Sequence, residues 1–310
     1  MNILAMNWRR FRESQALYAF LRDPVAIGSF TILVVLTLVS FLAPWTAQHN
    51  VYDTATLELL DAHTPPAWLD QGLERYPLGT DDQGRDLFSS IIFGMRTSLL
   101  IGLGAVALQA FLGICIGLIS GYTGGRLDTL LMRVADVQLS FSTLMVAIFI
   151  SAIFEAVLGV GFFERYAVLL LVVIIGLAEW PQYARTVRAS VLAEKKKEYV
   201  EAARVIGLPA SRIMWRQILP NALSPVLVIS TVQVANAIMS EAALSFLGLG
   251  MPVTQPSLGS LIKSGFTYIF SGSWWITLFP GITLVTLILV INLLGDWLRD
   301  YLNPKLYKHM

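Results

Sequence analysis

The sequence predicts an all-α membrane protein with six transmembrane helices. Of its 310 residues, 55% are hydrophobic and only 14% are charged, whereas charged residues make up about a quarter of an average soluble domain. Six apolar segments come close to the roughly 20 residues that a helix needs to cross the hydrocarbon core. Lysine and arginine gather in alternate connecting segments, as they do in multi-pass proteins. Together these observations favour a helical bundle in a membrane over a soluble fold.

The predicted spans are joined by connections of very different length, and they cover about residues 25–46, 97–121, 128–153, 166–183, 222–248 and 274–297. The first span follows a basic segment, residues 1–24, that lacks a small-residue cleavage site, so we expect a retained helix and not a cleaved signal. The fourth span is short before Glu179 and Pro181 interrupt it. A tilted helix can nevertheless continue past Trp180 into the polar segment behind it.

The distribution of basic residues sets the orientation of these spans. With the N-terminus in the cytoplasm, the inner segments hold sixteen lysines and arginines, whereas the outer segments hold five, namely Arg75, Arg85, Arg96, Arg165 and Lys263. The positive-inside rule therefore selects this orientation over its mirror image. We accordingly expect residues 1–24 and 301–310 in the cytoplasm and residues 47–96 on the outer side of the membrane.

The outer segment, residues 47–96, is too long for a simple turn, and we expect it to contain a helix of its own. Thr80 and Gln83 have the spacing of a capping box. Behind them, one helical face would gather the apolar side chains of Leu87, Phe88, Ile91, Ile92 and Met95. This pattern predicts an amphipathic helix that lies along the outer membrane surface before the second span begins.

No metal, cofactor or catalytic site is predicted in the chain. Asp81, Asp82 and Asp86 could offer oxygen ligands to calcium, but helix capping and solvation explain these acids without a metal. Cys115 is the single cysteine and lies within an apolar run, so we expect it simply to pack. None of the three histidines has a glutamate beside it, as the His-Glu-x-x-His zinc motif requires.

Two further classes are disfavoured by the sequence. The phosphate-binding run Gly-x-x-x-x-Gly-Lys-Ser/Thr does not occur, so we do not expect the chain to hydrolyse ATP by itself. The formal net charge of +1 argues against nucleic acid as a partner, because a phosphate-binding surface usually makes a domain strongly basic. An enzyme is therefore the weakest class.

The connection between the fourth and fifth predicted spans, about residues 184–221, has the pattern of a helix, a sharp turn and a second helix. Gly207 can take the left-handed conformation that ends a helix, and Pro209 has the fixed φ that suits the start of the next one. Before the turn, a helical wheel gathers one face from Tyr199, Ala202, Ala203 and Ile206.

The second helix of this connection is also amphipathic. Ile213, Met214 and Ile218 cover an apolar arc, whereas Arg212 and Arg216, four residues apart, project together from another side. Two interpretations of the helix pair stay open. It is either a stiff projection into the cytoplasm that transmits force or a pair of interfacial helices that lie on lipid.

The stretch EAARVIGLPASRIMWRQILP, residues 201–220, resembles the EAA loop of ABC-importer permeases, which reads Glu-Ala-Ala, three residues, Gly, nine residues and Ile-x-Leu-Pro. The residues that match in register are Glu201, Ala202, Ala203, Gly207, Leu219 and Pro220. Gln217 stands at the Ile position of the motif and Ile218 follows it. One hydrophobic contact of the loop is thereby left without its usual residue.

Further stretches along nearly the whole chain are similar to the second membrane subunit of the dipeptide, oligopeptide and nickel permease family. RDPVAIGSFTILVVLTLVSFLAP resembles its first span, YPLGTDDQGRDLFSSIIFGMRTSL its outer loop and GYTGGRLDTLLMRVADVQLSF its second turn and third span. The match continues in WPQYARTVRASVL, EYVEAAR and SEAALSFLGLG. Ser142 stands where the family has the proline of a Phe-Pro-x-Leu turn, so we expect a third span that is less kinked than in the relatives.

This resemblance implies a type I ABC-importer permease fold, with a permease core of five transmembrane helices over residues 97–300 and a coupling loop over about residues 184–221. In that family the coupling loop, here with Arg212 and Arg216, seats in a cleft of a cytoplasmic ATPase subunit. The implied partners are a homologous second permease, two ATPase subunits or domains that bind ATP and magnesium, and an extracytoplasmic substrate-binding protein. The implied setting is a bacterial inner membrane.

The same resemblance implies that the cargo is a dipeptide or a short oligopeptide. Nickel chelates and antimicrobial peptides stay open as alternatives within the family. On composition alone, a secondary transporter or channel is the rival class. Inverted repeats with paired broken helices would favour that class, but none is visible in the sequence, and the EAA loop counts against it.

Five charged residues within or beside the spans need a partner or a place near the interface, since a charge at the centre of a span is costly. Arg133 and Asp136, three residues apart on the third span, are expected to pair with each other, the alternative being a role in substrate binding. Glu179 and Asp296 lie near expected cytoplasmic ends, where snorkelling or capping suffices. Glu241 lies midway along the fifth span. It either faces the pathway or the partner subunit and helps to hold a peptide's charged terminus, or forms a structural hydrogen bond between helices.

Overall fold

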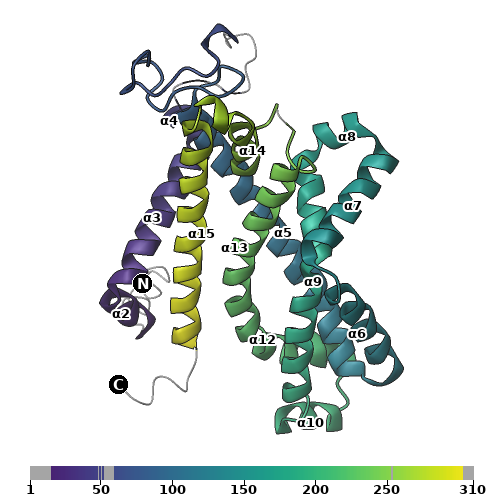
Figure 1. The fold of residues 1–310 in the computed structure, drawn as a ribbon. Coiled ribbons are helices and arrows are strands. Elements are labelled where there is room, and N and C mark those ends of the chain that lie inside the picture. Colours follow the sequence, from purple (N-terminus) through teal and green to yellow (C-terminus); the bar gives the residue numbers. More distant parts are fainter. Residues whose placement is uncertain (1–14, 48, 50, 52–58, 253, 303–310) are drawn as a thin grey trace.

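The computed structural model describes residues 15–47, 49, 51, 59–252 and 254–302, and these residues are mostly helical, with no β-strand among them (Figure 1). The helices in these ranges that are long and apolar enough to span a membrane are α3 (Pro24–Phe41), α5 (Leu87–Thr123), α9 (Ala167–Glu194), α13 (Ser224–Leu247) and α15 (Trp275–Leu302). A sixth span is reached if α6 (Gly125–Leu139) and α7 (Thr143–Leu158), which pass the same test together but are bent by 96° at the break between them, are counted as one. The predicted class is thus confirmed. Most of the predicted cytoplasmic segments 1–24 and 301–310 lies outside the described residues.

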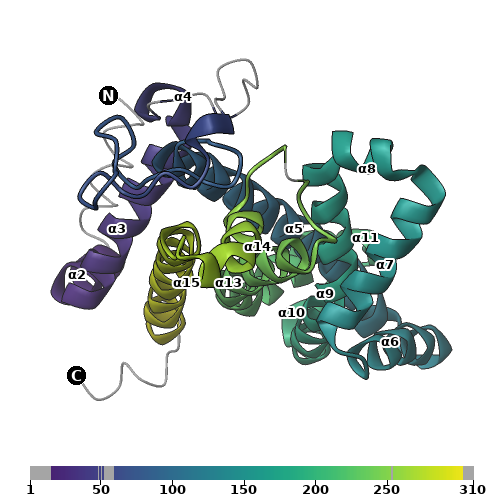
Figure 2. The ribbon, with the colours of Figure 1, turned by 45° about the horizontal axis from the view of Figure 1, so that its top comes forward.

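Short helices lie between and beside the spans, and they are α2 (Gln15–Arg22), α4 (Ala43–Thr46), η2 (Leu59–Asp61), α8 (Val160–Arg165), α10 (Glu198–Val205), α11 (Ala210–Ile213), a π-helix η3 (Met214–Ile218), α12 (Leu219–Ala222), α14 (Leu258–Tyr268) and η4 (Ile269–Ser271). Figure 2 shows α2, α3 and α15 on one side of the molecule and α6, α7 and α8 on the other. Between these two groups lie α5, α9 and α13, which form the centre of the bundle.

The most extensive helix contact is the one between α5 and α9. A Cβ atom at Gly117 would lie 2.5 Å from the carbonyl oxygen of Ala184 and 2.8 Å from Cβ of Val187, both on α9. Gly113 and Gly121, four residues to either side, also face α9 directly. Small residues at this spacing let two helix backbones approach within a membrane. The two helices therefore pack as one unit.

The first turns of α5 correct the prediction of a separate surface helix. α5 begins at Leu87 and continues without a break into the second span, so residues 87–96 belong to that span and not to a helix lying on the membrane. Its N-cap is Asp86, whose carboxylate accepts a hydrogen bond from the backbone N–H of Ser89 at 2.9 Å. The hydroxyl of Thr80 instead donates to the carbonyl oxygen of Asp61 at 2.5 Å, so the predicted capping box is wrong. Except for Phe88, the apolar stripe is buried inside the protein.

The predicted third span, residues 128–153, is interrupted by a break between α6 and α7. The 96° bend occurs although Ser142 replaces the proline of the resembling family. α6 ends at Leu139, and Ser142, with an extended backbone of φ −61° and ψ 134°, is the N-cap of α7. Just before it, the side chain of Gln138 is held against α9, because the indole N–H of Trp180 donates to Gln138 Oε1 at 3.1 Å. Contacts with α9 thus fix the bend without a proline.

α9 continues through Pro181 to Glu194, as expected for a span that extends past Trp180. A proline inside a helix removes the N–H that would bond to the carbonyl four residues earlier, which is here the carbonyl of Leu177. The side-chain amide of Gln138 donates to that carbonyl oxygen at 2.7 Å. The hydrogen bond that Pro181 removes is therefore replaced by one from the neighbouring helix, and α9 can stay continuous.

Candidate functional site

A helical projection lies at the end of the bundle opposite the outer segment, at the bottom of Figure 1. We refer to it as the knuckle (residues 198–222). α10 ends before Gly207, which has the left-handed φ of 81°, and Pro209 has an extended backbone and precedes α11. The predicted sequence of helix, turn and helix is confirmed.

One face of the knuckle packs on the membrane helices. This face is made by side chains that are at most 3% exposed, those of Val200, Ala203, Ile213, Ile218 and Ala222. The burial of Ile213 and Ile218 agrees with the predicted apolar arc of the second helix. For the first helix the predicted face is only partly right, because Ala203 is buried but Ala202 and Ile206 are exposed. The packing surface is turned toward Val200 instead, which the helical wheel did not include.

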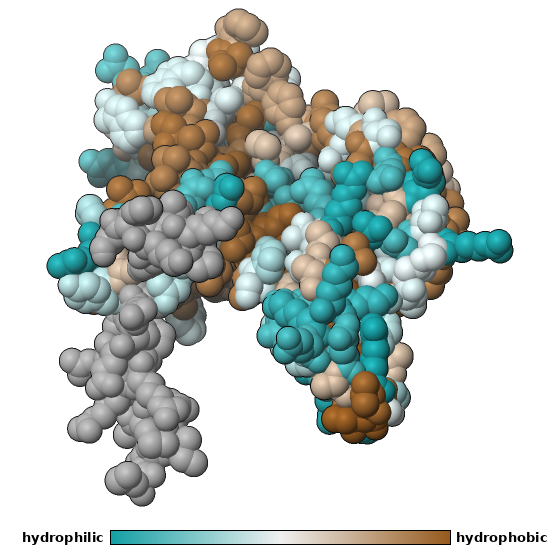
Figure 3. Space-filling model, turned by 90° about the horizontal axis from the view of Figure 1, so that it is seen from below, coloured by the Kyte–Doolittle hydropathy of each residue, from teal (hydrophilic) through white to brown (hydrophobic). Residues whose placement is uncertain are grey.

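The opposite face of the knuckle is open to its surroundings. Most of the residues that match the EAA loop or were predicted beside it are exposed on it, namely Glu201, Ala202, Gly207, Arg212, Arg216 and Pro220, whereas Leu219 is half-buried. At the turn, the side chains of Val205 and Ile206 are 88% and 77% exposed. Seen from below, this part of the molecule is a hydrophilic projection with an apolar tip (Figure 3). A stiff apolar tip of this kind fits contact with another protein.

A π-helical turn explains how the chain departs from the EAA motif by one residue. Residues Met214–Ile218 form a π-helix, in which one residue more than in an α-helix fills the turn. Ile218 is fully buried, whereas Gln217 is half-buried. The hydrophobic contact expected from the motif position of Gln217 is thus supplied by the next residue.

Charged residues at the end of α9 and in α10, where the knuckle joins the bundle, contact α5 and α6. Arg188 of α9 forms two parallel hydrogen bonds with Asp128 of α6, at 2.6 and 2.7 Å. The ammonium of Lys195 donates to the backbone oxygen of Tyr122, the last but one residue of α5, and lies 5.4 Å from the centre of its ring. Arg204 of α10 lies 5.8 Å from the same ring. A displacement of α10 therefore reaches both α5 and α6.

Tyr199 forms hydrogen bonds where α9 meets the knuckle. The hydroxyl of Tyr199 donates to the Glu194 carboxylate at 2.6 Å, and Asn221 donates to the Tyr199 hydroxyl at 3.3 Å. Partial burial and the hydrogen bond to Glu194 raise the pKa of the Tyr199 hydroxyl. The hydroxyl thus stays protonated and keeps donating at physiological pH, which links α9 to both ends of the connection.

The charges predicted within the spans have other partners than expected. Asp136 pairs with Arg185 of α9 at 2.5 Å, so the predicted pair with Arg133 on the same helix is wrong. Arg133 is exposed. The physical reason is the bend after α6, which lays this helix along the polar end of α9, where arginines of the next helix are in reach.

Glu241 is fully buried at a meeting point of three elements. Its carboxylate accepts hydrogen bonds at 2.7 Å from Ser98 of α5 and from Ser245 of α13. The Ser98 hydroxyl also accepts from the backbone N–H of Leu258, the first residue of α14, at 3.4 Å. The same hydroxyl of Ser245 accepts from the backbone N–H of Met251 at 3.0 Å. Glu241 thus holds the start of α14 and the segment before it against α5.

A second buried carboxylate, that of Glu179, was not singled out as a core residue by the sequence. It is 4% exposed, and it accepts from Gln109 of α5 at 3.1 Å and from Ser240 of α13 at 3.0 Å. Gln233 of α13 donates to it at 3.4 Å. The expectation of a snorkelling or capping position is therefore wrong. Gln109 and Gln233, polar residues inside apolar runs, were the available signal for this cluster.

The fold is that of the permeases of type I ABC importers. The structure aligns with a chain of the MetNI methionine ABC transporter, solved in inward-facing conformations, with a TM-score of 0.55 and 18% identity over 69% of this chain and 96% of that one. A second crystal form of the same transporter gives a TM-score of 0.54. At this identity the likeness shows the fold alone.

Family comparisons narrow this class. Residues 113–308 match the family described as the inner membrane component of binding-protein-dependent transport systems, and residues 4–66 match the N-terminal transmembrane domain of oligopeptide transport permease C. Because the first match covers more than half of the chain, the chain belongs to the family of binding-protein-dependent inner membrane transport components. It is a multi-pass membrane protein of the peptide ABC-importer permease type.

Relatives with peptide transport names match nearly the whole chain. The di/tripeptide transport system permease protein DppC of Pseudomonas aeruginosa is 38% identical over 93% of this chain and 90% of that protein. The dipeptide permease DppC of Escherichia coli is 38% identical, with 93% and 91% covered. The oligopeptide permease OppC of Bacillus subtilis is 35% identical, with 94% and 90% covered.

Proposed function

We propose that this chain is one of two membrane-spanning subunits of an ATP-driven, binding-protein-dependent importer of dipeptides or short oligopeptides in a bacterial inner membrane. The observation that carries the proposal is the knuckle, which places the EAA signature on an exposed projection in a chain similar to dipeptide permeases over nine-tenths of its length. A homologous second permease would complete the translocation pathway.

The knuckle would seat in a cleft of a cytoplasmic ATPase subunit, with the termini on the same side of the membrane. Its apolar tip, Val205 and Ile206, suits a pocket in that subunit, and the exposed Glu201, Arg212 and Arg216 suit its polar rim. ATP and magnesium would be bound by the two ATPase subunits and not by this chain. A substrate-binding protein would deliver the peptide from the outer side.

Motion of the knuckle has a direct route into the bundle. α9 is continuous from Ala167 to Glu194, and only Lys195, Lys196 and Lys197 separate it from α10. Since α9 packs closely on α5, a shift of the ATPase subunits would move two spans together. This arrangement supports a switch between inward-open and outward-open states driven by ATPase closure.

Uptake into proteoliposomes tests the proposal. The full complex, with ATP inside, should accumulate labelled dipeptides, and a complex without this chain should not. Tripeptides, longer peptides and a nickel chelate, offered in parallel, would identify the cargo within the family. Uptake of the nickel chelate alone would overturn the peptide assignment, and uptake that needs no ATP would overturn the importer class.

Two substitutions test the docking of the knuckle in the assembled complex. Gly207→Trp strains the left-handed turn and adds bulk to its exposed side, and Glu201→Lys reverses a charge of the EAA signature. Both should lower ATP-driven uptake severalfold or more. Glu198→Lys, three residues earlier in the same first turn of α10, is the matched charge reversal outside the EAA signature and should lower uptake less. Wild-type uptake in both test variants would contradict docking through the knuckle.

A further inference from the structure

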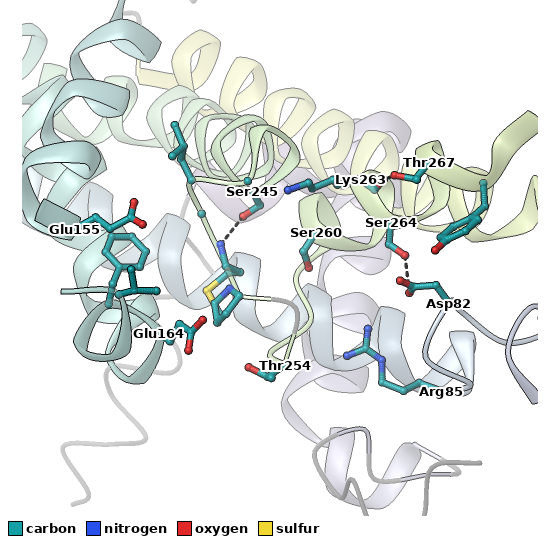
Figure 4. A pocket seen from close by; sticks show the side chains of 18 residues that line it. Asp82, Arg85, Glu155, Glu164, Ser245, Thr254, Ser260, Lys263, Ser264 and Thr267 are labelled. Atoms are coloured by element: carbon teal, nitrogen blue, oxygen red, sulfur yellow. Dashed lines mark hydrogen bonds between the residues drawn. The ribbon is translucent and has the colours of Figure 1, made fainter. Parts of the chain in front are cut away.

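A polar pocket lies at the end of the bundle away from the knuckle. Its volume is about 450 Å³, and it is lined by α7, α8, the C-terminal end of α13 with the segment after it, α14 and part of the outer segment (Figure 4). Pockets of roughly 300–1,000 Å³ are the size that holds small molecules. The charged residues around it are Asp82, Arg85, Glu155, Glu164 and Lys263.

Two acids, Glu155 and Glu164, lie on one side of this pocket, whereas Lys263, Arg85 and a third acid, Asp82, lie on the other side. Figure 4 shows Glu155 of α7 and Glu164 of α8 on one side and Lys263 of α14 on the other. None of these three side chains forms an ion pair within the described part of the chain. By contrast, Arg85 is buried and bonded to Asp81 at 2.6 Å, and Asp82 accepts from Ser264 at 2.6 Å.

The position of Lys263 depends on a glycine. Gly248 ends α13 in the left-handed conformation, with φ 85°, and the ammonium of Lys263 occupies the space that a Cβ atom at residue 248 would need. Any side chain at this residue would therefore displace the ammonium. The end of α13 both reverses the chain and leaves room for a cation beside the pocket.

The wall behind Lys263 is rigidly held. The Ser245 hydroxyl, which lines the pocket, donates to the buried Glu241 and accepts from the backbone N–H of Met251. The backbone of Ser257, before α14, is fixed by a capping box with Ser260. The α13 end, the segment after it and the start of α14 are thus held by hydrogen bonds, and small-molecule sites are usually largely pre-formed.

We propose that this pocket is a transient binding site for short zwitterionic peptides on the outer side of the permease, with Glu155 and Glu164 facing the N-terminal ammonium and Lys263 the C-terminal carboxylate. The inference takes the peptide cargo from the proposed function. It adds the charged groups by which the permease itself would recognise that peptide. A free dipeptide carries one charge of each sign, separated by its backbone, and the pocket offers, among the described residues, carboxylates without an ion pair on one side and the ammonium of Lys263 on the other. Hydrogen bonds to charged groups are the stronger kind and give orientation as well as affinity.

Photolabelling tests the site without the binding protein. A labelled dipeptide with a diazirine side chain is irradiated with the purified complex, and the modified residues are found by mass spectrometry. Label on the lining residues of α7, α8 or α14, displaced by unlabelled dialanine, is expected. Lys263→Met should lower this labelling about tenfold. Arg165→Met removes an outer cation that does not line the pocket and should leave the labelling unchanged.

Transport selectivity gives the second measurement, with one binding protein used throughout. Relative to the wild type, Lys263→Met should reduce uptake of dialanine about tenfold and uptake of dialanine amide much less. The double variant Glu155→Gln, Glu164→Gln should likewise reduce dialanine uptake more than uptake of N-acetyl dialanine. Comparison with the wild type cancels the preference of the binding protein.

The outcomes separate this inference from the proposed function. A wild-type complex without ATP-driven peptide uptake would refute the proposed function. Normal wild-type uptake, combined with variants that lower free and blocked peptides equally, would refute the peptide site alone. Unchanged labelling combined with weaker attachment of the binding protein would show that the pocket is a docking surface for that protein, which also refutes the peptide site.

Discussion

Replacing Gly117 by alanine tests whether the close contact between α5 and α9 is required for transport. The new Cβ atom would lie 2.5 Å from the Ala184 oxygen, 2.8 Å from Cβ of Val187 and 3.1 Å from the Arg188 nitrogen. Since favourable contacts lie at roughly 3.5–4.0 Å, the helices must separate by about 1 Å. Two of the three atoms are backbone atoms, so no side chain can rotate away. Overpacking of this kind costs about 1–3 kcal/mol, which corresponds to about 5- to 150-fold in an equilibrium constant.

The assay is made on the assembled complex, by thermal unfolding and by uptake together with ATPase turnover. Gly117→Ala should lower the melting temperature, and it should lower uptake more than ATPase turnover, because α9 leads directly into the knuckle. The control is Gly281→Ala in α15, where an added Cβ atom meets nothing within 4 Å. Wild-type melting and wild-type uptake in Gly117→Ala would refute the view that α5 and α9 move as one unit.

Three further predictions concern the knuckle and the buried polar groups. Ile206→Asp should abolish ATPase attachment in copurification but leave pairing with the second permease, and retained ATPase would contradict an apolar docking tip. Glu179→Leu should lower the stability of the complex in thermal unfolding by about 1–3 kcal/mol, because it leaves the donors of Gln109 and Gln233 unsatisfied, whereas Glu179→Gln should be milder; equal melting would argue against the cluster. Arg188→Met should reduce uptake by loosening α6 from α9, and unchanged uptake would show that this ion pair is dispensable.

Features that depend on neighbouring residues in the chain could be predicted from the sequence. The length of the apolar segments predicted the membrane spans, because the thickness of the hydrocarbon core sets a minimum length for every helix that crosses it. Gly207 and Pro209 predicted the turn of the knuckle, since each residue has a backbone preference that does not depend on tertiary contacts. The residues of the EAA signature were identified from their resemblance to the permease family, whereas periodicity alone left the role of the helix pair open.

Features that depend on helix contacts could not be predicted in this way. The stripe from Leu87 to Met95 has the same periodicity whether it faces lipid or protein, so the pattern could not separate a surface helix from the start of α5. Arg133 and Asp136 have the spacing of a pair, but the bend after α6 brings Arg185 closer. Glu179 seemed to lie near the membrane edge because the length of α9 beyond Pro181 was not known. In each case the partner lies far away in the sequence.

The unbroken course of α5 has a mechanical consequence. Its 37 residues extend over about 55 Å at 1.5 Å per residue, from the outer segment to the turn before α6. A straight rod of this length that pivots at one end by about 5° displaces its other end by about 5 Å, since the sine of the angle multiplies the length. Small rotations at the nucleotide-driven side would therefore appear as ångström-scale shifts outside, and a spectroscopic distance label near Leu87 could follow the working cycle from the far side of the membrane.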